Sequence, residues 1–385
     1  MNGSVVPVFK PGLFSLVFDG GLVVGDSNRL YVLNAAAGAI WTLLESKLSI
    51  GEAVSVLKQS FGLSEDGARS DLHAMLEQWT RLGLLESTSP HKPDDHYFEI
   101  ASPKRLSRSV EAAFSIGGIT FSIQTNSEDV AAHVFAALRI FKVNKRPDHV
   151  ITAEMKAVSP LSLLLIVDDD ERFEVANAAE MVGAIFQTMI ELVRGESNWL
   201  AIIHGAAISH NGMGILLSGA GGSGKSTLAA YLSARGFGYL SDDLIALSPR
   251  GAKIVPWPVA HSLKRGSWKV LEKFYPAIPQ IDIEVIGGRE IKFIPSPEDA
   301  WNNVGVSADI IVFPRYDGSN TTKLVKVRAF QALQMLVDDR IWLGHPITKK
   351  HVEAFLRELA KMRAYVLEYS DLQEAEVNLR QLIQG

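Results

Sequence analysis

The 385-residue sequence predicts a mixed α/β (α+β) protein, with a winged-helix-like domain at the N-terminus and a phosphate-loop domain at the C-terminus. Three observations support this fold class. Short apolar runs and amphipathic helical patterns fill the first 87 residues, a polar segment with two prolines follows them, and a glycine-rich loop lies in the second half. We expect a domain over 1–87, a linker over 88–97, an α+β segment over 98–198 and a phosphate-loop domain over 199–385.

The composition is that of an ordinary folded protein, with 47% hydrophobic and 21% charged residues. A formal net charge of -5 does not favour binding to nucleic acid or to an anionic membrane. The absence of cysteine excludes disulfides, cysteine-ligated metal sites and thiol nucleophiles. Neither a signal peptide nor an apolar run of the roughly 20 residues that cross a bilayer is present. We therefore expect a cytoplasmic protein with no nucleic-acid and no membrane partner.

The first 87 residues predict a hairpin followed by three helices. Leu13–Phe18 and Leu30–Leu33 are two apolar runs that flank a glycine-containing stretch, which is typical of two strands joined by a loose loop. The helices are recognised by their start signals and by apolar residues at three- and four-residue spacing. The predicted signals are an N-cap at Asn34, a capping box from Ser49 to Glu52, a third start near Ser64 and an end at Gly83.

The segment 98–198 predicts two further hairpins and two helices. Phe114–Ile123 contains a Gly-Gly turn between apolar residues, and residues 131–141 and 178–193 have helical periodicity. The strands Leu161–Val167 and Arg172–Val175 meet at Asp168–Asp170. Three adjacent aspartates are able to hold a cation, but a solvated turn between two strands is the simpler interpretation.

A glycine-rich loop connects a predicted strand to a predicted helix. The apolar run Gly214–Ser218 ends directly before it, and the helical pattern Thr227–Ala234 follows it. The loop matches G-x-x-x-x-G-K-[ST] completely, and this pattern lets backbone N–H groups and a helix N-terminus surround phosphate oxygens. We predict a nucleotide site formed by Gly219, Ala220, Gly221, Gly222, Ser223, Gly224, Lys225, Ser226 and Thr227.

Asp242 and Asp243 form a carboxylate pair inside the strand-like run Tyr239–Leu247. Two adjacent acids at the end of a buried strand are costly unless a cation or a proton-transfer task compensates. One of them is suited to hold Mg²⁺ and the other to take a proton from an attacking hydroxyl. His204, which precedes the loop strand by a hairpin, either faces the phosphates or is a structural histidine.

These motifs together resemble a known family. The order Ile203–Gly205, phosphate loop and Leu240–Asp243 is similar to the catalytic domain of HPr kinase/phosphorylase, a bacterial protein-serine kinase whose fold is related to phosphoenolpyruvate carboxykinase. The resemblance extends more weakly to the C-terminus and there is closer to the HPr-kinase-related proteins of modification gene clusters. It implies ATP and Mg²⁺ as cofactors and an alcohol group as the phosphoryl acceptor.

The resemblance also implies roles for individual residues. Lys225 would bind the triphosphate, Ser226 and one of the two aspartates would hold Mg²⁺, and the other aspartate would be the base. The resemblance does not fix the order of the aspartates, and we predict Asp242 as the base and Asp243 as the metal ligand. His204 matches the histidine of that family near the phosphates. The cations expected to stabilise the transferring phosphoryl group are Arg315 and, less directly, Lys264 and Arg289.

Two departures from that family change the expected reaction. Thr227 stands where the sugar-regulating kinase has an acidic residue, so neither the reverse phosphorylase reaction nor a second metal is expected. The later glycine-rich signature of that enzyme is missing, so we do not expect HPr to be the acceptor.

The first 87 residues are similar to PqqD, a small winged-helix protein that recognises leader peptides of ribosomally made natural products. The resemblance rests on Leu33–Asn34, the helix with Trp41, the capping-box helix and Arg81–Leu85. In that family the peptide adds as a strand beside the hairpin and packs against the third helix. A generic winged-helix or dimerisation module is the alternative.

The two resemblances together predict a kinase that captures a precursor peptide by its leader and phosphorylates a hydroxyl, with serine as the expected acceptor. Two alternatives stay open at this point. One is a small-molecule kinase, and the other is a non-catalytic switch in which nucleotide binding controls peptide presentation. Homo-oligomers are a further expectation, since related kinases assemble into oligomers.

Overall fold

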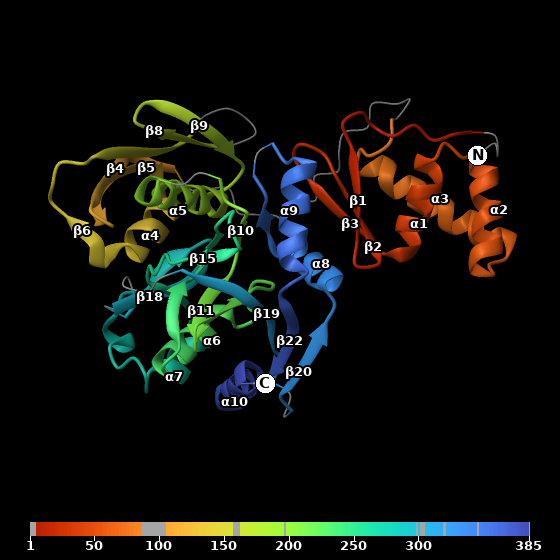
Figure 1. Ribbon diagram of the computed structural model, residues 1–385. Coiled ribbons are helices and arrows are strands. Elements are labelled where there is room, and N and C mark those ends of the chain that lie inside the picture. Colours follow the sequence, from red (N-terminus) through yellow and green to blue (C-terminus); the bar gives the residue numbers. More distant parts are fainter. Residues whose placement is uncertain are drawn as a thin grey trace. The chain divides into compact units, whose positions relative to one another are not determined.

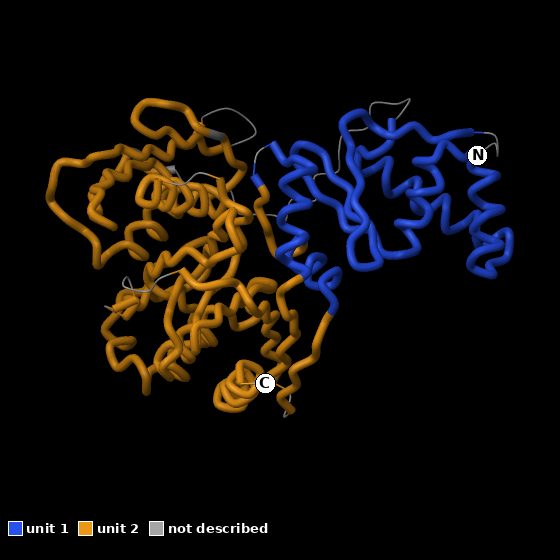
Figure 2. Tube along the Cα trace, viewed as in Figure 1, with its two compact units in different colours: residues 1–98, 328–337, 344–360 blue, residues 99–327, 338–343, 361–385 orange. Residues whose placement is uncertain are grey.

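The computed structural model describes residues 5–86, 105–156, 162–195, 198–297, 299–300, 305–318, 321–344 and 346–384. The chain divides into two compact units (Figure 2). One unit contains residues 1–98, 328–337 and 344–360, and the second contains residues 99–327, 338–343 and 361–385. The predicted linker 88–97, and Leu161 at the predicted start of a strand, lie outside the described residues.

The first unit contains a three-stranded antiparallel sheet instead of the predicted two-stranded hairpin (Figure 1). The extra strand is the central one, and it was missed because its glycines suggest a loop. A tight turn at Asp19 and Gly20, with φ of 44° and 81°, reverses the chain directly after the first strand. The strands are β1 (Phe14–Phe18), β2 (Gly21–Gly25) and β3 (Leu30–Leu33).

Three helices follow, and their predicted start signals are confirmed. Asn34, Ser49 and Ser64 each accept a hydrogen bond from the backbone N–H three residues later, and the capping box of Ser49 is complete. The indole rings of Trp41 and Trp79 meet edge to face at 5.1 Å in the core of this unit. The helices are α1 (Ala35–Glu45), α2 (Ile50–Phe61) and α3 (Glu65–Arg81).

Two segments from near the C-terminus complete the first unit. They form α9 (Lys349–Leu359) and most of α8 (Ala329–Asp339). The carboxylate of Asp19 accepts hydrogen bonds from Arg328 Nη2 at 2.9 Å and from the Phe330 N–H at 3.0 Å. The start of α8 is therefore capped by the turn between β1 and β2, far away in the sequence.

The second unit begins with a six-stranded sheet that has α4 and α5 on one face (Figure 1). The predicted helix 131–141 starts earlier and stops at Ala137, because the chain tightens into a 3₁₀ turn there. Asp168 and Asp169 form the predicted turn with φ of 50° and 69°. The elements are β4 (Arg105–Ile116), β5 (Ile119–Ser127), α4 (Glu128–Ala137), η1 (Arg139–Phe141), β6 (Lys142–Val143), β7 (His149–Met155), β8 (Leu163–Val167), β9 (Asp170–Val175) and α5 (Ala178–Arg194).

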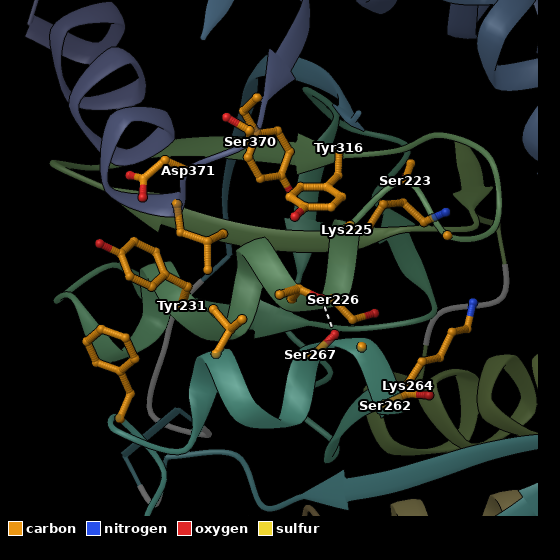
Figure 3. Close-up of a pocket in the computed structure, with 18 of the residues that line it drawn as sticks. Ser223, Lys225, Ser226, Tyr231, Ser262, Lys264, Ser267, Tyr316, Ser370 and Asp371 are labelled. Carbon is orange, nitrogen blue, oxygen red and sulfur yellow. Dashed lines mark hydrogen bonds between the residues drawn. The ribbon is translucent and has the colours of Figure 1, made fainter. Parts of the chain in front are cut away.

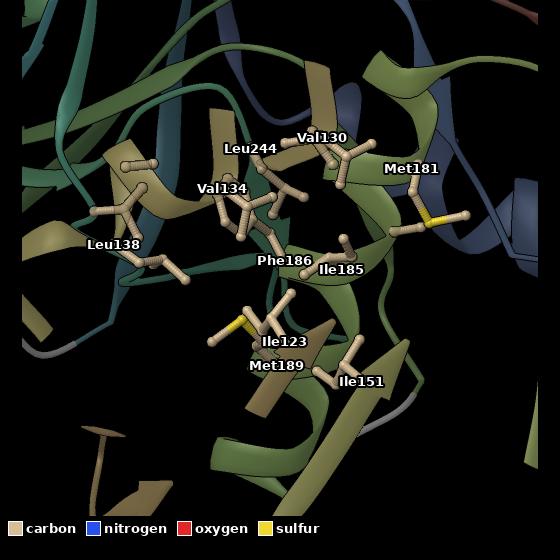
Figure 4. Close-up of a cluster of buried hydrophobic side chains, with 14 of the residues drawn as sticks. Ile123, Val130, Val134, Leu138, Ile151, Met181, Ile185, Phe186, Met189 and Leu244 are labelled. Carbon is tan, nitrogen blue, oxygen red and sulfur yellow. The ribbon is translucent and has the colours of Figure 1, made fainter. Parts of the chain in front are cut away.

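The hydrophobic core beneath this sheet is shared with later parts of the chain (Figure 4). Ile123, Phe186 and Met189 come from the six-stranded sheet and its helices, whereas Leu244 and Trp257 come from the region after the phosphate loop. The segment 105–195 is thus built into the same core as the residues that surround the predicted site.

The rest of the second unit is a ten-stranded mixed sheet and a small three-stranded sheet. The strand before the phosphate loop lies parallel to β19, which in turn lies parallel to β22. Among the described residues, none of the helices combines the length and the apolar character that crossing a bilayer requires. The elements are β10 (Ala201–Ile203), β11 (Ala206–His210), β12 (Met213–Leu217), α6 (Lys225–Ala234), β13 (Gly238–Ser241), β14 (Ile245–Leu247), β15 (Lys253–Val255), β16 (His261–Lys264), α7 (Arg265–Leu271), η2 (Ile278–Gln280), β17 (Glu284–Ile286), β18 (Arg289–Ile294), β19 (Val306–Tyr316), β20 (Lys323–Val327), β21 (Ile341–Trp342), β22 (Arg363–Tyr369) and α10 (Leu372–Gln384).

Candidate functional site

The predicted loop connects β12 to α6, and the helix begins at Lys225, two residues before its predicted start. Gly219, Gly222 and Gly224 have φ of 145°, 94° and 98°, which L side chains rarely adopt. A Cβ on Gly224 would also overlap the hydroxyl of Tyr369. The chain can therefore wrap around an anion at this point only because glycines occupy these positions.

Lys225 is 9% exposed, and its ammonium group lies inside the loop. It donates to the carbonyl oxygens of Gly219 and Ala220, and it lies 3.5 Å from a carboxylate oxygen of Asp339. The same oxygen accepts the Gly219 N–H at 2.8 Å and the hydroxyl of Ser218 at 3.2 Å. Asp339 is a site residue that the sequence analysis missed, because it lies 120 residues after Gly219 with no motif around it.

The aspartate pair does not lie inside one strand, as the sequence suggested, but in the connection between β13 and β14. The chain leaves one strand and enters a distant one here, and Asp243 adopts a φ of 65° to make this turn. The prediction was wrong because both flanks are apolar and extended, which leaves no signal of a break between them.

Asp242 is 1% exposed and is held against the loop helix. One of its oxygens accepts the hydroxyl of Ser226 at 2.9 Å and the N–H of Asp243 at 3.1 Å, and the other accepts the N–H of Ser262 at 3.0 Å. Burial, together with the charge of Asp243, raises the pKa of Asp242 to about 8.

Asp243 faces two histidines. Its oxygen Oδ2 lies 3.4 Å from Nε2 of His133 on α4, and its carbonyl oxygen lies 3.1 Å from Nδ1 of His204. Burial opposes ionisation of Asp243, but the neighbouring His133 and the charge of Lys225 outweigh burial and lower the pKa of this carboxyl. His133 comes from the segment whose role the sequence left open, and no motif marked it.

His204 lies between β10 and β11 and lines the same cavity as Lys225. Burial is the main cause that lowers the pKa of His204, and the charge of Asp243 opposes it. Its neutral ring is therefore the favoured form, with Nδ1 as the donor to the Asp243 carbonyl oxygen.

A cavity of about 830 Å³ lies over the loop (Figure 3). Gly221–Thr227, His204, Asp243 and Lys264 line it, as do side chains from α6, α7 and the start of α10. Lys264 is half-buried, and burial, followed by the charge of Arg289, lowers its pKa. The residues that line the cavity are His204, Gly221, Gly222, Ser223, Gly224, Lys225, Ser226, Thr227, Tyr231, Arg235, Asp243, Ser262, Lys264, Gly266, Ser267, Val270, Lys273, Phe274, Tyr316, Tyr369, Ser370, Asp371, Leu372 and Gln373.

Some predicted residues are not among those that line the cavity. Gly219, Ala220 and Asp242 are not in its lining, although Asp242 accepts the hydroxyl of Ser226, which is. Arg315, near the end of β19, has a side chain that is 56% exposed and lies 4.0 Å from Glu368. Its predicted contact with a transferring phosphoryl group stays a prediction.

The residues of this cavity fit a triphosphate with Mg²⁺. The buried Ser223 hydroxyl has no hydrogen-bond partner within the described part of the chain, and it lies in the loop beside the N-terminus of α6. Ser226 and Asp242 present adjacent oxygen atoms, the ligand type that Mg²⁺ prefers. Over the described ranges, no three acidic, histidine or cysteine side chains gather to hold a metal by themselves.

Comparisons with known proteins find a family model and a solved structure that are similar to part of this chain. Residues 21–85 match the family model "Coenzyme PQQ synthesis protein D (PqqD)", which confirms the predicted resemblance over those residues. The structure entitled "TbiB1 in Complex with the TbiA(beta) Leader Peptide" is 21% identical, with 22% of this chain and 99% of that chain covered and a TM-score of 0.21. No curated protein matches the chain.

Proposed function

We propose that this protein is an ATP-dependent kinase that phosphorylates a hydroxyl group of a ribosomally synthesised precursor peptide, and that its PqqD-like domain holds the leader of that peptide. The observation that carries the proposal is the 2.9 Å hydrogen bond from Ser226 to Asp242. It joins the phosphate loop to the carboxylate pair, whose second member, Asp243, lines the cavity over the loop. A nucleotide site with a carboxylate at its open side has the parts that phosphoryl transfer to an alcohol requires.

The contacts of the two aspartates favour the opposite roles from those predicted from the sequence, where Asp242 was the base and Asp243 the metal ligand. Asp242 accepts the hydrogen bond of the Ser226 hydroxyl and is not among the residues that line the cavity. Ser226 and Asp242 are therefore the residues that would hold Mg²⁺. Asp243 lines the cavity, so it is the residue that would accept the proton of an incoming hydroxyl. We therefore propose Asp242 as the metal ligand and Asp243 as the base.

The other residues of the cavity would bind the nucleotide or orient Asp243. Lys225 and the amides of the loop would hold the β- and γ-phosphates. When bound, ATP supplies the phosphoryl group: a bond forms between the acceptor oxygen and phosphorus, the bond to the leaving ADP oxygen breaks, and Asp243 receives the proton. His133 and His204 keep Asp243 in one orientation through its carboxylate and its carbonyl oxygen.

The PqqD-like domain offers a place for a peptide strand. β3 is an outer strand of its sheet, and within the described residues it pairs only with β2. Tyr31 of β3 donates a 3.5 Å hydrogen bond to the Leu82 carbonyl at the end of α3, so this edge and this helix lie close together. A leader that adds to β3 would raise the concentration of its attached acceptor near the cavity without tight binding there.

Intact mass spectrometry of a precursor peptide incubated with the full chain, Mg²⁺ and ATP tests the function. We expect a gain of one phosphoryl group that requires the leader and is lost in Lys225→Ala. Asp243→Asn should abolish transfer but keep nucleotide binding, whereas Asp242→Asn should weaken the Mg²⁺-dependent part of nucleotide binding.

The alternatives predict other results. Phosphorylation that is unchanged when the leader is removed, or that occurs on a free metabolite, would indicate a small-molecule kinase. Nucleotide and leader binding without transfer in any form of the protein would indicate a nucleotide-gated switch. If Asp242→Asn blocks transfer and Asp243→Asn does not, the base is Asp242, as the prediction from the sequence has it.

A further inference from the structure

The cavity extends well beyond the phosphate loop, along one face of α6. Thr227, Tyr231 and Arg235 follow one another at four-residue intervals on this face, and all three line the cavity. With a rise of 1.5 Å per residue, the distance from Thr227 to Arg235 is about 12 Å. The space beside α6 is therefore long enough for a group attached to the phosphates.

Two walls enclose this extension. One is formed by Val270 of α7 with Lys273 and Phe274 just after it, and the other by Asp371 and Leu372 at the start of α10. Figure 3 shows Tyr231 and Asp371 on the side of the cavity away from Ser223 and Lys264, with Ser226 and Ser267 between them. The extension thus lies at the opposite end of the cavity from Lys264.

The positions of the acids set the direction of a bound nucleotide. Asp243 and His204 mark the end where a hydroxyl would receive the phosphoryl group, so the terminal phosphate has to lie on that side. Lys225 reaches the β- and γ-phosphates, and the start of the loop helix reaches the phosphates nearer the sugar. The sugar and the base of the nucleotide then enter the extension along α6.

We infer that the groove between α6, α7 and the start of α10 binds the nucleoside of the phosphate donor, with the base beside Phe274 and the ribose beside Asp371. This inference rests on the proposed function. The groove would select among nucleoside triphosphates, because the phosphates held by the loop are common to all of them.

The side chains of the groove suit this ligand. Tyr231 meets Phe274 edge to face at 5.1 Å, and its hydroxyl donates to Glu376 at 2.9 Å, so the two rings form a rigid wall. Lys273 Nζ lies 4.9 Å from the centre of the Phe274 ring. The wall thus presents an aromatic ring with a cation over one face, and aromatic rings are the side chains on which nucleic-acid bases stack.

The carboxylate of Asp371 is held in place at the groove. One of its oxygens accepts the N–H groups of Gln373 and Glu374 at 2.8 and 2.9 Å, which fixes the side chain at the start of α10. Carboxylates bind the hydroxyl groups of a ribose in dinucleotide sites, so a carboxylate at this position of the groove has the chemistry for that contact.

Calorimetric titration with two probes distinguishes what each end of the cavity contributes to the affinity for the nucleotide. The probes are ATP and inorganic tripolyphosphate, each with Mg²⁺, and the protein is the full chain. We expect Phe274→Ala to weaken ATP binding by about tenfold to a hundredfold and to leave tripolyphosphate binding unchanged. Lys225→Ala should weaken both, and Lys269→Ala, on the exposed side of α7, should weaken neither.

A second variant keeps the test informative if Phe274→Ala does not fold. Asp371→Asn should remove the preference of the wild-type protein for ATP over 2′,3′-dideoxy-ATP, since only the former offers ribose hydroxyls. Equal effects of Phe274→Ala on both probes, no effect on either, or an unchanged preference in Asp371→Asn would overturn the inference. Failure of the wild-type protein to bind either probe would instead count against the proposed function itself.

Discussion

At the scale of single residues, the least expected feature is a fully buried histidine next to the aspartate pair. His261 is 0% exposed, and neither ring nitrogen has a hydrogen-bond partner among the described residues. Its ring packs on Tyr239 with 4.1 Å between the ring centres. Burial lowers the pKa of His261 to about 3, although the charge of Asp243 acts in the opposite direction. The folded protein therefore holds this histidine neutral.

This burial predicts a pH-dependent stability. In the unfolded chain His261 titrates near its ordinary pKa of 6.5, so below that pH the unfolded state binds a proton that the folded state does not. The stability that depends on neutral His261 is fully present above pH 6.5. As the pH falls from 6.5 toward 3, the free energy of unfolding decreases by about 1.4 kcal/mol per pH unit. Urea unfolding at pH 7.5 and 4.5 should show that wild type loses about 2 to 3 kcal/mol more than His261→Phe. Parallel losses in the two proteins would contradict the prediction.

At the scale of elements, the carboxyl end of α8 supports the phosphate loop. Asp339 is the last residue of this helix, where a negative charge is unfavourable for the helix dipole. Its side chain is only 7% exposed, and it binds the loop through Lys225, Gly219 and Ser218. One residue that follows the loop far along the chain, Asp339, thus binds the loop at three points.

Removing this support should destabilise the protein. Asp339→Ala leaves a buried ammonium group and the N–H of Gly219 without their carboxylate, and we expect a loss of about 3 to 5 kcal/mol in the free energy of unfolding. Asp339→Asn retains a hydrogen-bond acceptor and should lose less. The neighbouring Asp338 is exposed, so Asp338→Ala is the matched control. Equal stabilities of Asp339→Ala and Asp338→Ala in urea unfolding would show that the support is unimportant.

At the scale of the whole molecule, the first unit is discontinuous in sequence. Helices from near the C-terminus complete a unit that begins with the PqqD-like residues. Phe330 of α8 is 9% exposed, and a Cβ added to Gly21 of β2 would overlap its ring. Close contact between a strand near residue 21 and a helix near residue 330 therefore holds this unit together.

A double-mutant cycle tests this contact. The φ of Gly21 is not in the left-handed region, so an alanine there meets only the ring of Phe330. We expect Gly21→Ala to cost about 1 to 3 kcal/mol of unfolding free energy and to cost clearly less when Phe330 is replaced by leucine. Gly183→Ala in α5, where a Cβ meets nothing within 4 Å, is the control and should be neutral or slightly stabilising. An equal cost of Gly21→Ala in both backgrounds would refute the predicted overlap.

Local patterns in the sequence predicted several features correctly. Each helix cap bonds to a backbone N–H only three residues later, and this holds for Asn34, Ser49 and Ser64. The phosphate-loop motif likewise lies directly between the strand and the helix that it predicts, so these signals are complete in the sequence. The same holds for the PqqD resemblance, which family comparison confirms over residues 21–85. By contrast, β2 was missed because its glycines have the composition of a loop, although pairing with strands on both sides makes it a strand.

Neighbouring residues along the chain were enough to predict local elements: the helix starts and the strand–loop–helix order around the glycine-rich loop. Which residues meet at the site depends on the folded arrangement instead. His133 and Asp339 reach Asp243 and Lys225 from α4 and from the end of α8, and the pairing of Ser226 with Asp242 depends on where β13 ends. This difference arises because hydrogen bonds and ion pairs act over a few ångströms in space, whereas a sequence motif records only neighbours along the chain.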